Sequence, residues 1–355
     1  MKNKRFGRAA TIAAAAVLAA AGLAASAATD GNSYTVTNLV SDQPGVAPLT
    51  DPSLVNAWGL TASPTSPWWV ADNGTNVSTL YRADGSKVAL TVNVRNAPTG
   101  AVANTGTGFS VSNGVTSGPA RFIFSTEEGT ILGWNPTVSA DAVLAANSPL
   151  SGGIYKGLAI ASTSAGTFLY ATDFHNDRVD VFDSNFHPVT MSGFVDSKIP
   201  DGYAPFGIET VAGRIVVTYA KQDADAEDDV AGQGHGFVDL FDTSGRLLVR
   251  VARHGQLNSP WGIALAPPSF GAFGGDLLIG NFGDGRINAF EPQPDGTYEL
   301  VGPLRTSDHQ RVVIHGLWAL QFGKGAVNNG PATTLFFTAG PDDESHGMFG
   351  TITSN

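Results

Sequence analysis

The sequence predicts an all-β fold, a six-bladed β-propeller whose ring is closed by an N-terminal strand. Composition gives the first support, because 43 glycines, 20 prolines and only 14% charged residues are unsuited to long helices. The second support is a β-meander pattern that recurs along the chain. The third is a strand-like segment near the N-terminus that belongs to no meander of its own. A chain of 355 residues can form one unit if it is built from such repeats.

The recurring unit is clearest in residues 258–290, which read NSPWGIALAPPSFGAFGGDLLIGNFGDGRINAF. One β-run follows Trp261, a second ends at Asn281, and a tight Gly-Asp-Gly turn leads to a third. The glycines that open the inner runs are spaced by 41 to 57 residues, which suits a four-stranded blade with variable loops. These glycines are Gly59, Gly100, Gly157, Gly207, Gly262 and Gly316.

The expected β-runs can be assigned to six blades in chain order. Blade one takes 56–60, 67–72, a run ending at 81, and 87–94; blade two takes 100–104, a polar loop at 109–118, 120–125 and 130–134. Blade three takes 157–161, 167–172 and 178–183; blade four takes 207–211, 214–219, 236–242 and 247–251. Blade five takes 258–290 and an outer run at 298–304; blade six takes 316–322, 334–338 and 348–353.

The ring needs a closing strand, because otherwise two sheet edges stay open. Blade six lacks a fourth run, and residues 33–40 (SYTVTNLV) form a strand-like segment without a blade. We therefore expect this segment to become the outer strand of blade six. Seven blades would require two meanders around residues 109–135, and this alternative stays open.

The first 27 residues predict a secretory signal peptide rather than part of the fold. Four basic residues precede an alanine-rich apolar run, and Ala25-Ser26-Ala27 fits a cleavage site. A retained membrane anchor is the weaker alternative, since alanine contributes little to membrane insertion. We expect a protein secreted to the extracellular or periplasmic space, with no membrane insertion after cleavage and a single propeller domain over residues 28–355.

The charge and the cysteine content limit the partners. The formal net charge of −11 becomes −15 once the four basic residues of the leader are removed. Such an acidic surface argues against nucleic acid and anionic membranes as partners. The chain has no cysteine, so neither disulfides nor thiol chemistry can contribute. We expect a monomer that binds a small molecule, a carbohydrate or a protein.

The repeat resembles NHL-type six-bladed propellers. The repeated pattern is an aromatic-Gly-Ile/Leu start, a strand ending in Asp or Asn, a turn, and an Arg-Val/Ile-x-x-Phe strand. The longer blocks 38–60, 219–242 and 281–290 resemble an uncharacterised family of secreted bacterial propeller proteins. The pattern is also similar to gluconolactonase-type propellers, which bind metal through an Asn before the inner glycine. Here none of the six positions is Asn, which speaks against that activity: Trp58, Thr99, Lys156, Phe206, Trp261 and His315.

Oxygen-bearing side chains end four of the six second strands in this alignment, namely Asp72, Glu127, Asp173 and Asn281. Equivalent positions of successive blades converge at one end of a propeller tunnel, where several carboxylates could bind Ca²⁺. The alternative is that each side chain accepts hydrogen bonds from its own turn, and this is the commoner outcome. The acidic loop of blade four is a second candidate, since Asp223, Asp225 and Glu227 alternate as Ca²⁺ ligands can. A solvated acidic loop is its alternative.

Two further groups, the histidines in turns and the aromatic residues near the inner strands, each allow a functional and a structural interpretation. Acidic residues precede His235 and His346, and His175 lies in the matching turn of blade three, so acid–base chemistry is one interpretation. Turn histidines without catalytic function are the other. Aromatic residues near the inner-strand starts could line a tunnel mouth or pack between blades. No catalytic residue can be assigned from the sequence.

The sequence thus favours a secreted propeller that acts as a binding or interaction scaffold, with Ca²⁺ as the expected cation. An extracellular metal-dependent hydrolase or lyase with its site at the tunnel mouth is the alternative.

Overall fold

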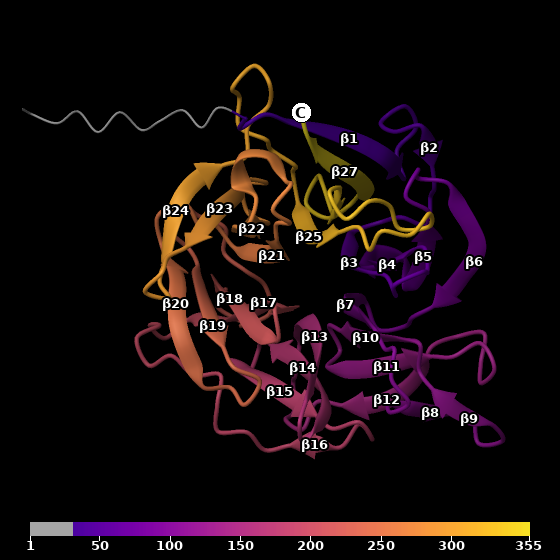
Figure 1. Ribbon diagram of the computed structural model, residues 1–355. Coiled ribbons are helices and arrows are strands. Elements are labelled where there is room, and N and C mark those ends of the chain that lie inside the picture. Colours follow the sequence, from indigo (N-terminus) through magenta and orange to yellow (C-terminus); the bar gives the residue numbers. More distant parts are fainter. Residues whose placement is uncertain (1–30) are drawn as a thin grey trace, which may run out of the picture.

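The computed structural model describes residues 31–355 and forms a six-bladed β-propeller (Figure 1). The predicted signal peptide, residues 1–27, lies outside the described residues. Within residues 31–355 no helix is both long and apolar enough to cross a membrane.

Each blade is an antiparallel sheet of at least four strands, and successive strands run from the tunnel outward. Blade one has β3 (Ala57–Thr61), β4 (Trp68–Asp72), β5 (Val77–Tyr81) and β6 (Lys87–Asn93); blade two has β7 (Pro98–Ala103), β10 (Phe122–Thr126), β11 (Thr130–Trp134) and β12 (Val143–Asn147). Blade three has β13 (Tyr155–Thr163), β14 (Gly166–Asp173), β15 (Arg178–Phe182) and β16 (Pro188–Val189); blade four has β17 (Tyr203–Val211), β18 (Arg214–Lys221), β19 (Phe237–Phe241) and β20 (Leu247–Arg253). Blade five has β21 (Pro260–Leu265), β22 (Leu277–Asn281), β23 (Ile287–Pro292) and β24 (Tyr298–Pro303).

The sixth blade confirms the predicted ring closure. It contains β25 (Leu317–Phe322), β26 (Leu335–Ala339) and β27 (Met348–Ser354), and its outer strand is β1 (Tyr34–Ser41). β1 pairs antiparallel with β27 along its whole length, from Tyr34 opposite Ser354 to Ser41 opposite Met348 (Figure 1). A short parallel strand, β2 (Leu49–Thr50), extends this blade. The seven-blade alternative is therefore wrong.

The predicted polar loop of blade two holds an additional hairpin. Strands β8 (Ser110–Ser112) and β9 (Ser117–Pro119) pair with each other outside the blade sheets. The missed outer strand β12 completes the blade. Two short 3-10 helices, η1 (Asn73–Thr75) and η2 (Gly271–Phe273), lie in connections.

Small residues on the inner strands let neighbouring blades approach around the axis. A Cβ on Gly59 would lie 2.3 Å from the carbonyl oxygen of Thr99, and one on Gly207 would lie 2.2 Å from that of Trp261. Distances this short are incompatible with a side chain, so the recurring glycine is a packing requirement of the ring.

The strand pairing corrects the alignment of the repeats at two points. In blade six, Leu317 and Leu320 pair as Ala57 and Leu60 do in blade one, so the axial position is Ala319 instead of Gly316. In blade two, β10 ends at Thr126, which pairs with Pro98, so Glu127 lies one residue beyond the strand end. That single-residue difference places Glu127 in the turn, where it is free to reach its neighbours.

Candidate functional site

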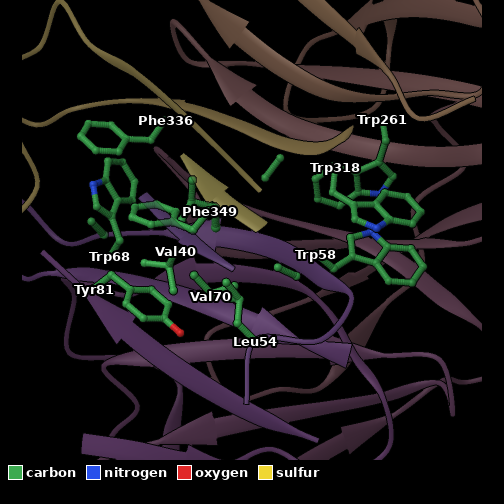
Figure 2. Packing of buried hydrophobic residues seen from close by; sticks show 14 of the residues in the cluster. Val40, Leu54, Trp58, Trp68, Val70, Tyr81, Trp261, Trp318, Phe336 and Phe349 are labelled. Carbon is green, nitrogen blue, oxygen red and sulfur yellow. The ribbon is translucent and has the colours of Figure 1, made fainter. Parts of the chain in front are cut away.

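Aromatic side chains fill the tunnel near the end where the inner strands begin. Trp58 and Trp318 stack with ring centroids 3.8 Å apart, and Phe282 stacks on the other face of Trp318 at 3.9 Å. Trp261 meets Trp318 edge-on at 5.8 Å, and Figure 2 shows Trp58, Trp261 and Trp318 together, away from Trp68. These pairs join blade six with its two neighbours, blades one and five, as the interpretation of packing between blades expects, while His315 is exposed.

Six polar side chains lie at the same end as this aromatic stack and form what we call the polar ring: Asn56, Asn73, Glu127, Lys156, Asp228 and Glu344. They come from blades one, two, three, four and six, either at the start of an inner strand or in the connection between second and third strands. These connections all lie at the same end of the propeller. Residues far apart in the sequence therefore meet at one tunnel mouth.

Hydrogen bonds link the ring continuously from blade six to blade two. Asn56 Nδ2 donates to Glu344 Oε2 at 2.5 Å and to Asn73 Oδ1 at 3.2 Å, and Asn73 Nδ2 donates to Glu127 Oε2 at 2.9 Å. Asn56 Oδ1 accepts from the indole N–H of Trp318 at 2.9 Å. The aromatic stack and the ring are thereby one connected unit.

A buried lysine continues the ring into blades three and four. Lys156 is 2% exposed, and its Nζ lies 2.6 Å from Glu127 Oε1 and 3.1 Å from Asp228 Oδ1. Burial acts to lower the pKa of Lys156, but the carboxylates of Glu127 and Asp228 outweigh it and raise that pKa. Nζ also lies 5.3 Å from the ring centroid of Trp58, a cation–π distance. The ammonium therefore stays charged at neutral pH at the tunnel mouth.

Glu344 is the ring residue whose protonation changes near neutral pH. Burial, reinforced by the negative charge of Glu127, raises the pKa of Glu344 to about 7. Its backbone is unusual, because Asp342, Asp343 and Glu344 are three consecutive non-glycine residues with φ of 55°, 51° and 64°. Left-handed conformation costs an L-residue roughly 1–2 kcal/mol. Such strain is concentrated at functional sites, where it holds a group in a required place.

The four strand-end residues predicted as metal ligands do not gather at one point. Asp72 Oδ2 accepts from the N–H of Thr79 at 2.8 Å, and burial raises the pKa of Asp72 well above its usual value. Asp173 accepts from the N–H groups of Ile154 and Asn176, both at 3.2 Å. These two side chains satisfy local backbone groups, as the structural alternative expects.

Asn281 and Glu127 behave differently from each other. Asn281 Nδ2 donates to the carbonyl of Gln256 at 2.7 Å and to Asp284 at 3.0 Å, which fixes it in its own turn. Glu127 alone of the four belongs to the polar ring. Within residues 31–355, no group of three or more His, Cys, Asp or Glu side chains has a geometry that could hold a metal ion. The Ca²⁺ site therefore stays a prediction.

The acidic loop of blade four is ordered by its own backbone. Asp223 Oδ1 accepts from the N–H of Glu227 at 2.9 Å, and Asp225 is exposed. Glu227 lines a cavity of about 380 Å³ together with Glu127 and His175. The loop contributes to the tunnel mouth mainly through Asp228, which the sequence argument left unassigned.

The remaining predicted histidines have structural partners. His235 Nδ1 lies 2.8 Å from the carbonyl oxygen of Val230, and His346 Nδ1 lies 2.7 Å from Asp42 Oδ2. The sequence predictions missed five of the six polar-ring residues, all except Glu127. One signal could have found Lys156, since it is the only charged residue directly before one of the five axial glycines.

Comparison with known proteins adds two viral relatives. The uncharacterized protein R648 of Acanthamoeba polyphaga mimivirus is 34% identical over 90% of this chain and 80% of its own length. The uncharacterized protein L690 of the same virus is 32% identical over 90% of this chain and 85% of its own length. This chain belongs to the family of R648 and L690. These relatives are viral, whereas the resemblance stated from the sequence was to bacterial proteins. No family model matches the chain.

Solved structures share the fold. A Bacteroides thetaiotaomicron protein of unknown function matches 90% of this chain and 76% of its own with a TM-score of 0.57 at 11% identity. A glucose dehydrogenase matches 90% of this chain and 100% of its own length with a TM-score of 0.54 at 13% identity. A streptogramin B lyase matches 91% of this chain and 97% of its own length with a TM-score of 0.52 at 10% identity. At these identities the likeness concerns the β-propeller alone.

Proposed function

We propose that this protein is a binding propeller that takes a small organic cation at the polar ring. One observation carries the proposal: three ring carboxylates, those of Glu127, Asp228 and Glu344, face the single ammonium of Lys156. Within residues 31–355 no hydrogen bond is made to Glu344 Oε1 or to Asp228 Oδ2. The mouth thus offers acceptors and excess negative charge to an incoming cation.

A protonated amine fits this arrangement better than Ca²⁺. Calcium needs six to eight oxygens at about 2.3–2.6 Å around one point. The ring carboxylates are spread around the mouth, and two of them are already bound to Lys156. An ammonium group needs only one or two acceptors, and the partly exposed face of Phe282 next to Trp318 offers apolar contact to its carbon chain.

Calorimetric titration with n-butylammonium tests the proposal. We expect binding that tightens as pH rises from about 6 to about 8, since Glu344 loses its proton there and gains a charge that attracts the ligand. Glu344→Gln should weaken binding at least about tenfold at the upper pH, an effect of one charge-assisted hydrogen bond. The exposed neighbour of Glu127, Glu128, provides the matched control Glu128→Gln, which should bind as wild type does.

Calcium is the competing ligand in the same experiment. If Ca²⁺ binds in the titration and a chelator lowers the melting temperature, the ligand of the polar ring is Ca²⁺, as predicted from the sequence, and not an amine. Equal binding of n-butylammonium to wild type and Glu344→Gln would contradict the proposed site.

The extracellular hydrolase or lyase is the second candidate. It is favoured by the pKa of about 7 of Glu344, because a group titrating near neutral pH can take up and return a proton during a reaction. Turnover of a lactone and ester panel, with and without Ca²⁺, tests this. The pH–rate profile should have an inflection near pH 7, and Glu344→Gln should be inactive. A rate that does not change with pH would contradict the catalytic role of Glu344.

We also propose export of an NHL-like monomer, supported by the leader-like residues 1–27. Expression of the full chain, followed by N-terminal sequencing of protein from the medium or periplasm, should place the first residue after Ala27. Material that keeps Met1 inside the cell would contradict export.

A further inference from the structure

A second cavity lies at the opposite end of the tunnel from the polar ring. It has a volume of about 230 Å³ and is lined by the far ends of three inner strands, β17, β21 and β25, from blades four, five and six. Glu209, Gln321 and Lys324 provide its polar groups. We call this cavity the Glu209 pocket. It is separate from the polar ring, with which it shares no residue.

The walls of the Glu209 pocket are mainly apolar. Ile263, Ala264, Leu265, Leu320 and Phe322 contribute to its lining, and Leu265 is 44% exposed at its edge. The pocket continues into a narrow cavity along the tunnel, since both are lined by Glu209, Ile263, Leu320 and Gln321. Pockets that bind small molecules combine such walls with a few polar groups that fix orientation.

One of those polar groups lacks a partner. Gln321 Nε2 donates to Glu209 Oε2 at 3.1 Å, but Oε1 of Gln321 is buried and forms no hydrogen bond to any residue from 31 to 355. If the amide is turned over, the nitrogen takes the unpartnered place instead. Either way a buried amide atom is left without a partner, and this costs free energy until something binds there.

The carboxyl of Glu209 lies beside this amide. Its Oε1 accepts from the N–H of Thr210 at 3.0 Å. Burial raises the pKa of Glu209, although the charge of Lys324 acts in the opposite direction. A buried carboxyl with a raised pKa favours its uncharged form. The pocket therefore suits an uncharged ligand that can form hydrogen bonds.

We infer that the Glu209 pocket binds a small, largely apolar alcohol whose hydroxyl donates to Gln321 Oε1 while its carbon skeleton packs between Ile263 and Leu320. This function is independent of the proposed cation site at the polar ring. The volume is sufficient for a molecule the size of a six-membered ring with a short substituent.

The test uses benzyl alcohol and toluene, which differ in the hydroxyl alone, with the full propeller. Ligand-observed NMR titration should give about tenfold tighter binding of the alcohol to wild type, the effect expected for satisfying one buried polar atom. Gln321→Leu keeps the side-chain size but removes the acceptor. In this variant the ratio of the two affinities should fall to about one.

Two controls locate the binding. Leu265→Trp, at an exposed edge position, should fill the pocket and abolish binding of both probes while the melting temperature stays as in wild type. Glu344→Gln, at the other mouth, should leave both affinities unchanged. An alcohol preference that survives Gln321→Leu, or probe binding that survives Leu265→Trp, would overturn the inference. So would the absence of a preference in wild type.

Discussion

The two mouths of the tunnel are built from different parts of the blades. The polar ring lies on strand starts and on the connections between second and third strands, which differ in length from blade to blade. The Glu209 pocket is formed by the ends of inner strands and by the residues directly after two of them, Ala212, Gly323 and Lys324. Both mouths contain a glutamate whose burial raises its pKa, Glu344 and Glu209.

The difference lies in how each mouth handles charge. At the polar ring a lysine that is 2% exposed is paired with two carboxylates, so its charge is compensated. At the Glu209 pocket the lysine, Lys324, is exposed and forms no ion pair within residues 31–355. The connections between second and third strands thus carry a hydrogen-bonded polar site, whereas the ends of the inner strands form a mainly apolar cavity. The aromatic stack lies between the two proposed binding sites.

The largest effect is expected from removing the centre of that stack. Trp318 is 1% exposed and contacts Trp58, Trp261, Phe206 and Phe282. Trp318→Ala should lower the free energy of unfolding by about 4 kcal/mol, because it leaves a large cavity and releases Asn56 from its indole partner. Urea denaturation measures this. Phe282→Ala, at the partly exposed end of the stack, should lower the free energy of unfolding by about half as much. Equal losses would show that Trp318 is not the centre of the stack.

The next effect concerns the buried cation. Lys156→Met keeps the length of the side chain but leaves Glu127 and Asp228 without their partner. The free energy of unfolding should fall by about 2–3 kcal/mol, which is less than for a fully buried ion pair because Glu127 is 30% exposed. Lys198→Met, at an exposed lysine, should change stability by less than about 0.5 kcal/mol. Adding Glu127→Gln to Lys156→Met should restore part of the loss, and no recovery would argue against the ion pair.

The blade architecture followed from the sequence because it depends on local features. Strand alternation, turns and the axial glycine are each visible within one repeat, and the segment without a blade identified the closing strand β1. Blade six was misaligned because Gly316 resembles the axial glycine, while the true position holds Ala319. The outer strand β12 was missed because its residues, VLAAN, give no clear alternation.

The site was harder to predict because its contacts cross blades. Glu127 was found, but for the wrong reason, since it was aligned with strand ends that satisfy their own turns. Asn56 and Glu344 are 288 positions apart, and only closure of the ring brings them together. Lys156 carried a sequence signal, a charge at a position that elsewhere holds aromatic residues or Thr, yet its partners depend on loop paths that no local pattern encodes.

A smaller effect should come from Glu344. Its carboxyl has a folded-state pKa of about 7, above that of an unfolded glutamate, so the folded protein holds the proton more tightly. Stability should therefore fall as pH rises from about 4.5 to about 7 and then stay level. Glu344→Gln removes this loss and should be more stable than wild type by about 1–2 kcal/mol near pH 8, after allowance for partial exposure, but equal to it near pH 4. Melting curves of wild type and Glu344→Gln across this pH range test the prediction, with Glu128→Gln as control. A stability difference that does not change with pH would mean that Glu344 does not titrate as stated.

The smallest effect sharpens the contrast at the other mouth. Lys324 acts on Glu209 through its charge alone and lowers the pKa that burial raises. Lys324→Met should leave the free energy of unfolding within about 0.5 kcal/mol of wild type, because it is exposed and unpaired in the described part of the chain. The pKa of Glu209 should rise, which carboxyl ¹³C NMR can follow against pH, with Glu209→Gln used to assign the signal. If the signal of Glu209 is unchanged, the charge is screened by solvent, and the Glu209 pocket is governed by burial alone. If instead Lys324→Met destabilises the protein as much as Lys156→Met does, the contrast between the two mouths is wrong.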